Sequence, residues 1–431
     1  MHIRLLDKDL MIFFKSVVLK VLTISVLTSS VLQAAEWKLE PSVGIRTQYN
    51  DNVGLRTEAN NPVGSTGYTL DPKIKLAAEE QNLWGLSLST RGKFTRYQDL
   101  RDADSNNVYV NLDSSRQTER AMLRLNASLT RNTNFDDDYD TESPFAGLTD
   151  DKTKRKTITF SPSARWNLSQ TSVLIFSINT TDVSYDEVIS TNLRDYTNNS
   201  VSFQAYWQML ERHTLGYTAS YTEQETPEVN YSSDTTVLNV DYTYNINQSS
   251  DLKFSLGGRY LNTLQKDGLF LGCVTPTPFD GPNSCAFGAP ILGDLENKND
   301  GVTVNLSYSN QTERTSNAFN VARNVIPSST GSVQEQRSVN YKFSLKNTQR
   351  FSSNLLLDGL ETVTIGGGDS SYDRTRYRIE PSVFYELNRD WWLSFRYSYI
   401  YQNFTNTDQD STSNAVYINL LLNWPKLATT Y

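Results

Sequence analysis

Hydrophobic and polar residues alternate strictly over long segments of this chain. Residues 390–402, DWWLSFRYSYIYQ, carry an apolar or aromatic side chain at every second position from Trp391 to Tyr401, with Ser394 and Arg396 among the residues between them. A period of two predicts an extended strand, because successive side chains point to opposite faces. Strands of globular proteins are about 5–6 residues long, whereas a strand that crosses a bilayer needs about 9–11 residues. This segment is long enough to cross a membrane.

The same alternation recurs along the whole chain and predicts about eighteen strands. The alternating segments cover residues 37–49, 68–76, 84–94, 108–112, 121–129, 158–166, 174–178, 201–207, 215–221, 238–244, 252–260, 302–308, 319–321, 339–345, 355–357, 377–385, 391–401 and 416–424.

The connections between these segments alternate in length. Short polar turns are expected at residues 79–82, 167–171, 210–213, 247–250 and 387–390, and long connections at residues 50–67, 131–154, 185–199, 262–299 and 324–337. Outer-membrane barrels sort their connections in this way, with the short turns in the periplasm, whereas a Greek-key sandwich does not. The sequence therefore predicts an all-β fold, a transmembrane antiparallel up-and-down β-barrel with short periplasmic turns and long extracellular loops.

The N-terminal residues have the features of a secretory leader. Within residues 11–35, Lys15 and Lys20 precede and interrupt an apolar run, and small residues end at Ala35. This pattern predicts a signal peptide over residues 1–35 and export from the cytoplasm. Beyond it, the chain has no apolar run of about 20 residues, which a transmembrane helix would need. The bacterial outer membrane is the location that agrees with export and with a barrel.

The predicted barrel domain covers residues 36–424 and is followed by a short tail, residues 425–431. The last alternating residue is Trp424, so the terminal Tyr431 is out of phase with the final strand and shares its parity with Leu427 and Thr429. We expect the barrel assembly machinery of the outer membrane to be a partner of the chain. The alternation alone does not explain how that machinery would read this end.

Charge and aromatic residues are consistent with this topology. The whole chain has a net charge of −8, and removal of residues 1–35, which carry more basic than acidic residues, makes it more acidic still. An acidic exported chain is not expected to bind nucleic acid. Trp and Tyr residues fall near the strand ends, as in the interfacial girdles of barrels. The residues predicted for the periplasmic rim are Trp166, Trp207, Trp391 and Trp424, and those for the outer rim are Tyr49 and Tyr221.

If the apolar positions face lipid, the intervening positions line the lumen. Thirteen cationic residues then face the lumen and are candidate pore-lining residues: Arg46, Lys73, Lys75, Arg91, Lys93, Arg124, Arg165, Lys253, Arg259, Lys342, Arg376, Arg378 and Arg396. Eight acidic residues share this face: Glu40, Asp71, Asp113, Asp241, Asp251, Asp358, Glu380 and Glu386. The wall is mixed but basic. Two interpretations remain open, namely that it passes or binds anionic or sugar-like solutes in a water-filled lumen, or that the charges pair with one another and only hydrate the wall.

Cys273 and Cys285 lie in a segment rich in Pro and Gly, inside the predicted long connection 262–299. In an oxidising compartment they are candidates for a local disulfide, and two free thiols are the alternative. The disulfide would close a short loop and would stabilise the fold by roughly 3 kcal/mol.

No enzymatic chemistry, cofactor or metal site is predicted. After removal of the leader, His213 in a short turn is the remaining histidine, and a surface histidine is the simpler explanation for it. Acidic residues in segments 134–142 and 149–151 could bind a divalent cation through oxygen ligands, but they lack EF-hand spacing. Acidic loops of this kind are usually solvated.

Three segments resemble a known group. The sequences EPSVGIRTQYNDNVGL (residues 40–55), VARNVIPSSTG (321–331) and VYINLLLNWPKL (416–427) resemble the β-barrel porin type 2 family. Members of that family are outer-membrane proteins that are often encoded with exopolysaccharide and exosortase genes. The resemblance implies a role in polysaccharide export or assembly, with outer-membrane lipid, an anionic polysaccharide or other export components as partners. It supplies no catalytic residues.

Three functions therefore compete. The first is a channel or accessory barrel for an anionic exopolysaccharide, and the second is a general diffusion porin with no link to polysaccharide. The third is a structural or adhesive surface protein with a closed lumen. An energised transporter with a plug is not expected, because the first strand begins almost directly after the leader.

Overall fold

The computed structural model describes residues 36–80, 83–133, 153–186, 193–273, 290–328, 332–365, 373–405, 409–424 and 427–430. Side chains are described for these residues except Asn60, residues 267–273, residues 290–292 and residues 427–430. None of the helices in these ranges is long and apolar enough to cross a membrane. The elements are β1 (Glu36–Asn50), η1 (Glu58–Asn60), β2 (Ser65–Glu80), β3 (Trp84–Tyr97), η2 (Arg101–Ala103), β4 (Ser105–Gln117), β5 (Ala121–Thr133), β6 (Lys154–Asn167), β7 (Ser172–Asp186), β8 (Tyr196–Leu210), β9 (His213–Thr226), η3 (Pro227–Val229), β10 (Tyr231–Asn247), β11 (Ser250–Cys273), β12 (Pro290–Gln311), β13 (Thr315–Pro327), β14 (Val333–Lys346), β15 (Phe351–Ile365), β16 (Arg374–Glu386), β17 (Trp391–Phe404), β18 (Gln409–Asn423) and β19 (Leu427–Thr430).

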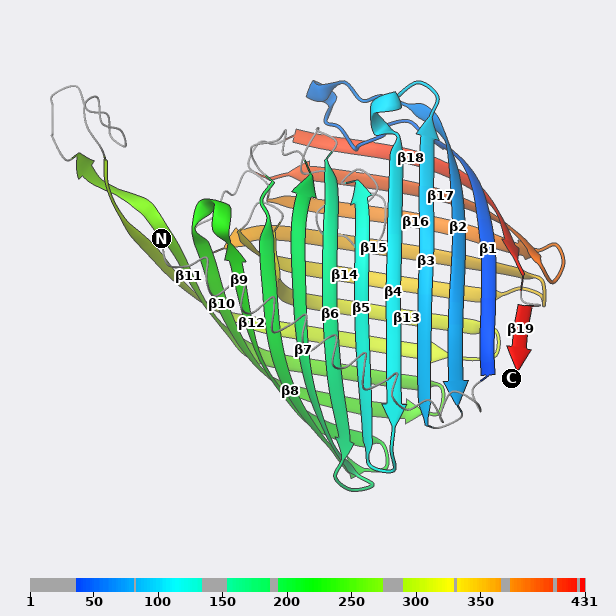
Figure 1. Ribbon diagram of the computed structural model, residues 1–431, viewed down its shortest axis with the longest axis horizontal. Coiled ribbons are helices and arrows are strands. Elements are labelled where there is room, and N and C mark those ends of the chain that lie inside the picture. Colours follow the sequence, from blue (N-terminus) through cyan, green and yellow to red (C-terminus); the bar gives the residue numbers. More distant parts are fainter. Residues whose placement is uncertain are drawn as a thin grey trace.

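Strands β1 to β18 form one closed antiparallel barrel. Each strand pairs with its neighbours in the sequence, and β1 closes the ring by pairing with both β2 and β18. Figure 1 shows the strands of the front wall crossing those of the back wall at a steep inclination, as strand tilt in a barrel requires. The predicted fold class is confirmed, and every segment predicted from alternation lies in a strand, except that Trp424 stands one residue beyond the end of β18.

The ends of the barrel differ, as the sequence predicts. Strand pairs such as β6–β7, β8–β9 and β16–β17 are joined by short turns at one end, which we call the short-turn end. The connections at the opposite end, here the long-loop end, include the segment between β1 and β2, where η1 lies. Closure of the ring leaves no sheet edge facing lipid along the paired strands.

Two predicted long connections are wrong in extent. Residues 324–337 lie mostly in β13 and β14, and much of the segment 262–299 belongs to β11 and β12, which continue past the rim as a projecting hairpin (Figure 1). These parts of the strands carry Gly, Asn and charged residues in place of alternating apolar ones. Main-chain hydrogen bonds hold a hairpin together without an apolar face, so the strands run beyond the end of the alternation.

The last described segment adds to the closure of the barrel. β19 pairs with the start of β1, with Leu427 opposite Leu39, whereas β18 ends with Asn423 opposite Ser42. The chain therefore has one more residue than β1 between these two pairs, so the register shifts by one residue. The shift pairs Leu427 with Leu39 and Thr429 with Trp37, a change of phase that alternation alone did not predict.

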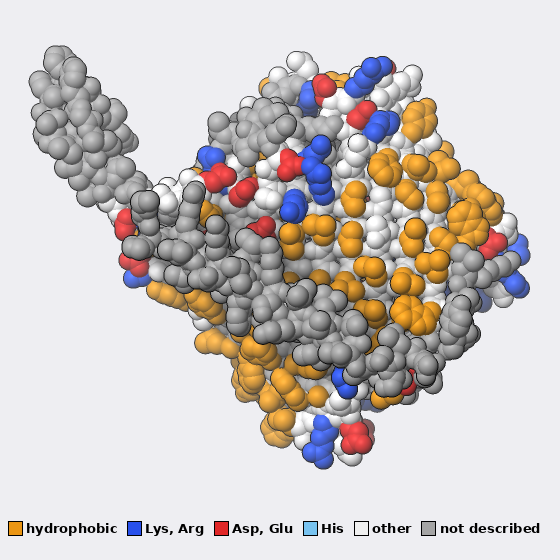
Figure 2. All heavy atoms as spheres, viewed as in Figure 1, with side chains coloured by type: hydrophobic (Ala, Val, Ile, Leu, Met, Phe, Trp, Pro, Cys, Tyr) orange, Lys and Arg blue, Asp and Glu red, His pale blue; other side chains and the backbone are white. Residues whose placement is uncertain are grey.

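Apolar side chains cover the outer wall. Ile45 is 55% exposed and Leu238 is 61% exposed, and many other large apolar residues on the same face are also exposed. Figure 2 shows these side chains as a broad field over the strands, with charged residues gathered toward the ends. Trp166, Trp207 and Trp424 are exposed near the short-turn end, and Tyr49 and Tyr221 near the other end. Such a surface is suited to a bilayer with aromatic residues at its interfaces.

Candidate functional site: the charged wall of the lumen

The strand register places all thirteen candidate pore-lining cations on the face opposite the apolar field. In β16, for example, Arg376 and Arg378 alternate with the exposed Tyr377 and Ile379. Adjacent strands continue this arrangement, because residues that pair across an antiparallel ladder share a face. In β16 and β17 the paired residues Ser382 and Arg396 follow the same rule.

Burial divides the candidate residues into two zones. The exposed candidates are Arg124, Arg165, Lys253 and Lys342, near the short-turn end, and Lys73 in the middle of β2. The buried candidates are Lys93, Arg259, Arg376 and Arg378, which lie toward the long-loop end, while Lys75, Arg46, Arg91 and Arg396 are intermediate. Among these candidates, burial thus increases toward the long-loop end.

On β1, β2 and β3, several charges pair with one another. Arg91 on β3 donates two hydrogen bonds to Asp71 on β2, with Nε–Oδ1 and Nη2–Oδ2 distances of 2.7 and 2.5 Å. Lys75 Nζ lies 3.1 Å from Glu40 Oε2 on β1. Paired charges of this kind hydrate and position the wall but leave little net field.

Arginines are concentrated on the neighbouring strands β16, β17 and β1. Arg374, Arg376 and Arg378 lie at alternate positions of β16, so their side chains leave the same face at a spacing of about 6.6–6.8 Å. All three are buried, with no more than 4% of each residue exposed. Arg374 Nη1 donates to Gln402 Oε1 on β17 at 3.4 Å. We call these three residues the arginine row.

Arg378 has weak compensation for a buried charge. Its Nη2 lies 4.0 Å from Asp358 Oδ2 on β15, which is too far for a hydrogen bond. Its Nε and Nη2 have no hydrogen-bond partner within the described part of the chain. Buried guanidinium groups are normally hydrogen-bonded, because an unpaired buried charge is costly. An anion in the lumen would supply the missing acceptor.

Two further arginines extend the arginine row across the closure of the barrel. Tyr417 on β18 is buried, with the Cζ atom of Arg396 4.2 Å from its ring centroid and that of Arg46 5.9 Å from it. The guanidinium groups are within the range of cation–π attraction. Arg396 Nη1 also contacts Glu380 Oε1 at 3.4 Å. We call Arg374, Arg376, Arg378, Arg396, Arg46 and Tyr417 the arginine cluster; Asp358 and Glu380 are the carboxylates paired with it.

Sequence reasoning missed several charged or polar residues of this wall. Arg374 shares the parity of Arg376 and stands directly before the predicted strand, and Tyr417 stands on the polar parity between Val416 and Ile418. Both could have been found by extending the alternation and by assigning Tyr by parity. A second group, around Glu335, lies on the apolar parity of β13 to β15, and the sequence places Glu335 and Arg337 in the predicted connection 324–337.

The remaining candidates carry no site. His213 lies at the start of β9, where its Nδ1 is 2.7 Å from the hydroxyl of Tyr242 and its ring stacks on Tyr244 at 4.9 Å. It belongs to the aromatic rim of the short-turn end. The predicted Cys273–Cys285 disulfide lies outside the described residues, since only the backbone of Cys273 is described. The acidic segments 134–142 and 149–151 also lie outside them.

Comparisons with known proteins identify no family for this chain. No protein-family model matches the sequence, and no curated protein matches it. The ferric-catecholate import receptor Fiu of E. coli K12 matches with 10% identity and a TM-score of 0.46, over 88% of this chain and 81% of that one. OccAB3 of Acinetobacter baumannii (9% identity) and a BenF-like porin of Pseudomonas fluorescens Pf-5 (10% identity) both match with a TM-score of 0.43, over 90% of this chain and 99% of each of theirs. These similarities assign no substrate.

The closed ring of strands and the apolar outer surface decide the class of protein. A barrel whose outward side chains are apolar and whose inward side chains are charged is stable only with lipid around it and water or polar groups within it. The chain is an outer-membrane β-barrel protein of porin-like architecture.

Proposed function

We propose that the protein is an outer-membrane channel for anionic solutes and that the arginine cluster selects them. The observation that carries the proposal is the concentration of arginines on β16, β17 and β1. Arg374, Arg376 and Arg378 are buried, and within the described residues Arg378 has no hydrogen-bond partner on Nε and Nη2. Fixed charges in a low-dielectric wall attract mobile ions of opposite sign. The paired charges on β2 and β3 contribute less to this selection.

An acidic polysaccharide is the finer proposal for the solute. The arginine row offers cations at regular intervals along one strand, and a chain of acidic sugars offers carboxylates at intervals. Tyr417 between two arginines adds an aromatic surface next to the charges. The resemblance of three segments to the β-barrel porin type 2 family also supports export or assembly of an exopolysaccharide. A general diffusion porin would use the same cations without a preference for saccharides.

Reversal potentials across a planar bilayer with a KCl gradient test the channel. The unmodified protein is expected to prefer anions, and Arg376→Glu with Arg378→Glu is expected to reduce or reverse that preference. Arg314→Glu with Arg350→Glu makes the same change of charge in exposed short turns and serves as a control, expected to retain anion preference. Cation preference in the unmodified protein, or equal effects of both pairs, would refute the proposed selectivity. A barrel without conductance would favour the structural or adhesive alternative.

A deletion strain tests the finer proposal. If the solute is an exopolysaccharide, the strain is expected to secrete less of it, and the unmodified gene is expected to restore secretion better than the Arg376→Glu, Arg378→Glu variant does. Normal secretion by the deletion strain would leave the general porin as the better function.

A further inference from the structure

The ladder between β12 and β13 covers only part of the two strands. Their ladder runs from Gln311 opposite Ser316 to Val304 opposite Arg323 and stops there. Both strands continue beyond it, β12 back to Pro290 and β13 on to Pro327. In the long-loop half, these two strands therefore have no described ladder between them.

In that half, the outer ends of β13, β14 and β15 lie inside the wall formed by β9 to β12. Val333, Gln334 and Glu335 are consecutive residues of β14 and only 2%, 2% and 4% exposed. Consecutive strand residues point to opposite faces, so a strand in a single-layered wall would leave one face toward lipid or solvent. Both faces of this part of β14 are covered.

Apolar contacts show which surfaces meet. Tyr231 on β10 and the fully buried Leu261 on β11 point toward the lumen, and they form one cluster with Val333 of β14. Val325 of β13 and Ile365 of β15 pack against this cluster. The register places these two residues and Val333 on one face of β13 to β15. Nearer the short-turn end, the same face of these strands is the outer, apolar face of the barrel. The inner face of β10–β11 thus covers the outward face of β13–β15.

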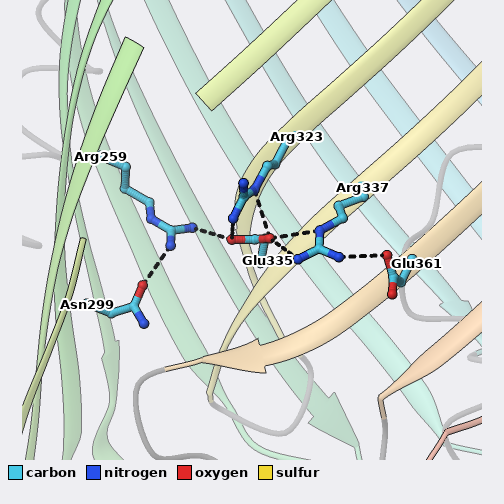
Figure 3. A network of polar contacts seen from close by, with 6 residues as sticks. All are labelled: Arg259, Asn299, Arg323, Glu335, Arg337 and Glu361. Atoms are coloured by element: carbon cyan, nitrogen blue, oxygen red, sulfur yellow. Dashed lines mark hydrogen bonds and ion pairs between the residues drawn. The ribbon is translucent and has the colours of Figure 1, made fainter. Parts of the chain in front are cut away.

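A group of charged residues joins the two layers (Figure 3). Glu335 Oε2 is 3.2 Å from Arg259 Nη1, which comes from β11 in the covering layer. The same carboxylate accepts hydrogen bonds from Arg323 at 2.9 and 3.0 Å and from Arg337 Nε at 3.0 Å, both in the inner layer. Arg337 Nη1 reaches Glu361 at 3.0 Å, and Arg259 Nη2 reaches Asn299 at 2.7 Å. We call these six residues the Glu335 cluster.

The described contacts between the layers are made by side chains. Besides the Glu335 cluster and the apolar cluster, Gln224 of β9 donates to the main-chain oxygen of Ser332 at 3.4 Å. Side-chain contacts can break without loss of any ladder in the ring. The inner layer can therefore move relative to the covering layer while β12 and β13 stay paired over residues 304–311 and 316–323.

We propose that the outer ends of β13 and β14 are a gate of the lumen and that the Glu335 cluster holds this gate closed. The proposal rests on the proposed channel function, whose conduction the gate would regulate. Glu335 pairs with three guanidinium groups in an interface where the side chains of Glu335 and Arg259 are only 5% and 2% exposed. If its charge is removed, these cations repel one another across the two layers, and the interface opens.

Labelling of Leu261→Cys tests the movement directly, without any transport assay. The variant is made with Cys273→Ser and Cys285→Ser, so that its thiol is the single one in the chain. A membrane-impermeant maleimide is expected to react slowly with it in the otherwise unmodified protein and roughly a hundredfold faster with Glu335→Gln, because loss of one partner of a buried ion pair strongly favours opening. Glu361→Gln, at the exposed edge of the same cluster, is the control and is expected to change the rate by less than about threefold.

A second variant keeps the test decisive if Glu335→Gln does not fold. Arg259→Gln removes the one described ion pair between the layers and leaves Glu335 with Arg323 and Arg337. It is expected to accelerate labelling as well. Equal labelling rates in the unmodified protein and in the folded variants would overturn the gate.

Conductance separates the gate from the channel. Glu335→Gln is expected to raise single-channel conductance or open probability, and a short bis-maleimide joining Leu261→Cys to Val333→Cys is expected to abolish the increase. Anion conduction that is equal in all variants, with unchanged labelling, refutes the gate and retains the channel. Faster labelling of variants that never conduct refutes the channel and retains a movable wall.

Discussion

Gly301 on β12 lies directly beneath the guanidinium group of Arg259, its partner in the β11–β12 ladder. A Cβ atom at position 301 would lie 2.4 Å from Arg259 Nη2 and 2.7 Å from its Cζ. The absence of a side chain lets Arg259 cross β12 on its way to Glu335. The glycine thus belongs to the connection between the two layers of the wall, although it makes no polar contact itself.

We predict that Gly301→Ala destabilises the folded barrel by about 1–3 kcal/mol, the usual cost of inserting a methyl group into a packed site. Arg259 would have to move away from Glu335, its buried partner. Urea unfolding followed by tryptophan fluorescence in lipid vesicles measures the change. Gly258→Ala is the matched control, because a Cβ there would meet no atom within 4 Å. A Gly301→Ala protein as stable as the control would contradict this role.

Asp71→Asn is predicted to increase anion preference. Asp71 accepts two hydrogen bonds from Arg91, and its replacement by Asn removes one negative charge from the lumen beside this cation. Reversal potentials measure the effect. The double variant Asp71→Asn, Arg91→Gln removes both charges and is expected to return to the selectivity of the unmodified protein. A single variant with lower anion preference would show that the pair does not face the conducting path.

The closure of the barrel is held at the long-loop end by Asp51 and Asn414. The main-chain nitrogen and Nδ2 of Asn414 donate to the two oxygens of Asp51, at 2.7 and 2.8 Å. Asn414→Ala removes the side-chain bond to a charged acceptor and is predicted to cost about 1.5–3 kcal/mol. The temperature at which the folded form is lost on unheated gels reports it. Asn126→Ala, an exposed lumen-facing position, should shift that temperature little; equal shifts would argue against a special role for this closure.

Leu256 and Ser255 on β11 test the two faces of the wall. Leu256 is 46% exposed on the apolar face, so Leu256→Arg would place a charge in hydrocarbon and is predicted to cost roughly 2–4 kcal/mol. Ser255→Arg makes the neighbouring change toward the lumen and is expected to be nearly neutral. Both are compared by urea unfolding in vesicles. A larger loss for Ser255→Arg would reverse the assignment of the faces.

The sequence was sufficient for the ring of strands, because lipid outside and charge inside impose alternation on each of them. It was insufficient where that constraint ends. Arg323 and Glu335 occupy apolar parity, since their face is covered by β11 and not by lipid. The sequence pattern around Glu335 suggested a loop. No local sequence pattern shows that the outer ends of β13 to β15 will lie inside β10 and β11.

The sequence predicted the inward direction of most residues of the arginine cluster but not their proximity. Arg376, Arg378, Arg396 and Arg46 follow from parity, but their proximity depends on the register between β16, β17, β18 and β1. Tyr417 joins the arginines because β18 lies between the strands of Arg396 and Arg46 in space. Which of these charged residues lie together on the wall could be decided only from that register.

The pairing of β19 and β18 with β1 has a consequence for the order of folding. β1 must find partners more than three hundred residues away in sequence, at Ala415–Asn423 and at Leu427–Thr430. Contacts of such separation carry a large loss of chain entropy and form late. Until they form, one flank of the earliest strand stays unpaired and is open to misassociation with other chains. Folding of this molecule therefore finishes where its two ends meet.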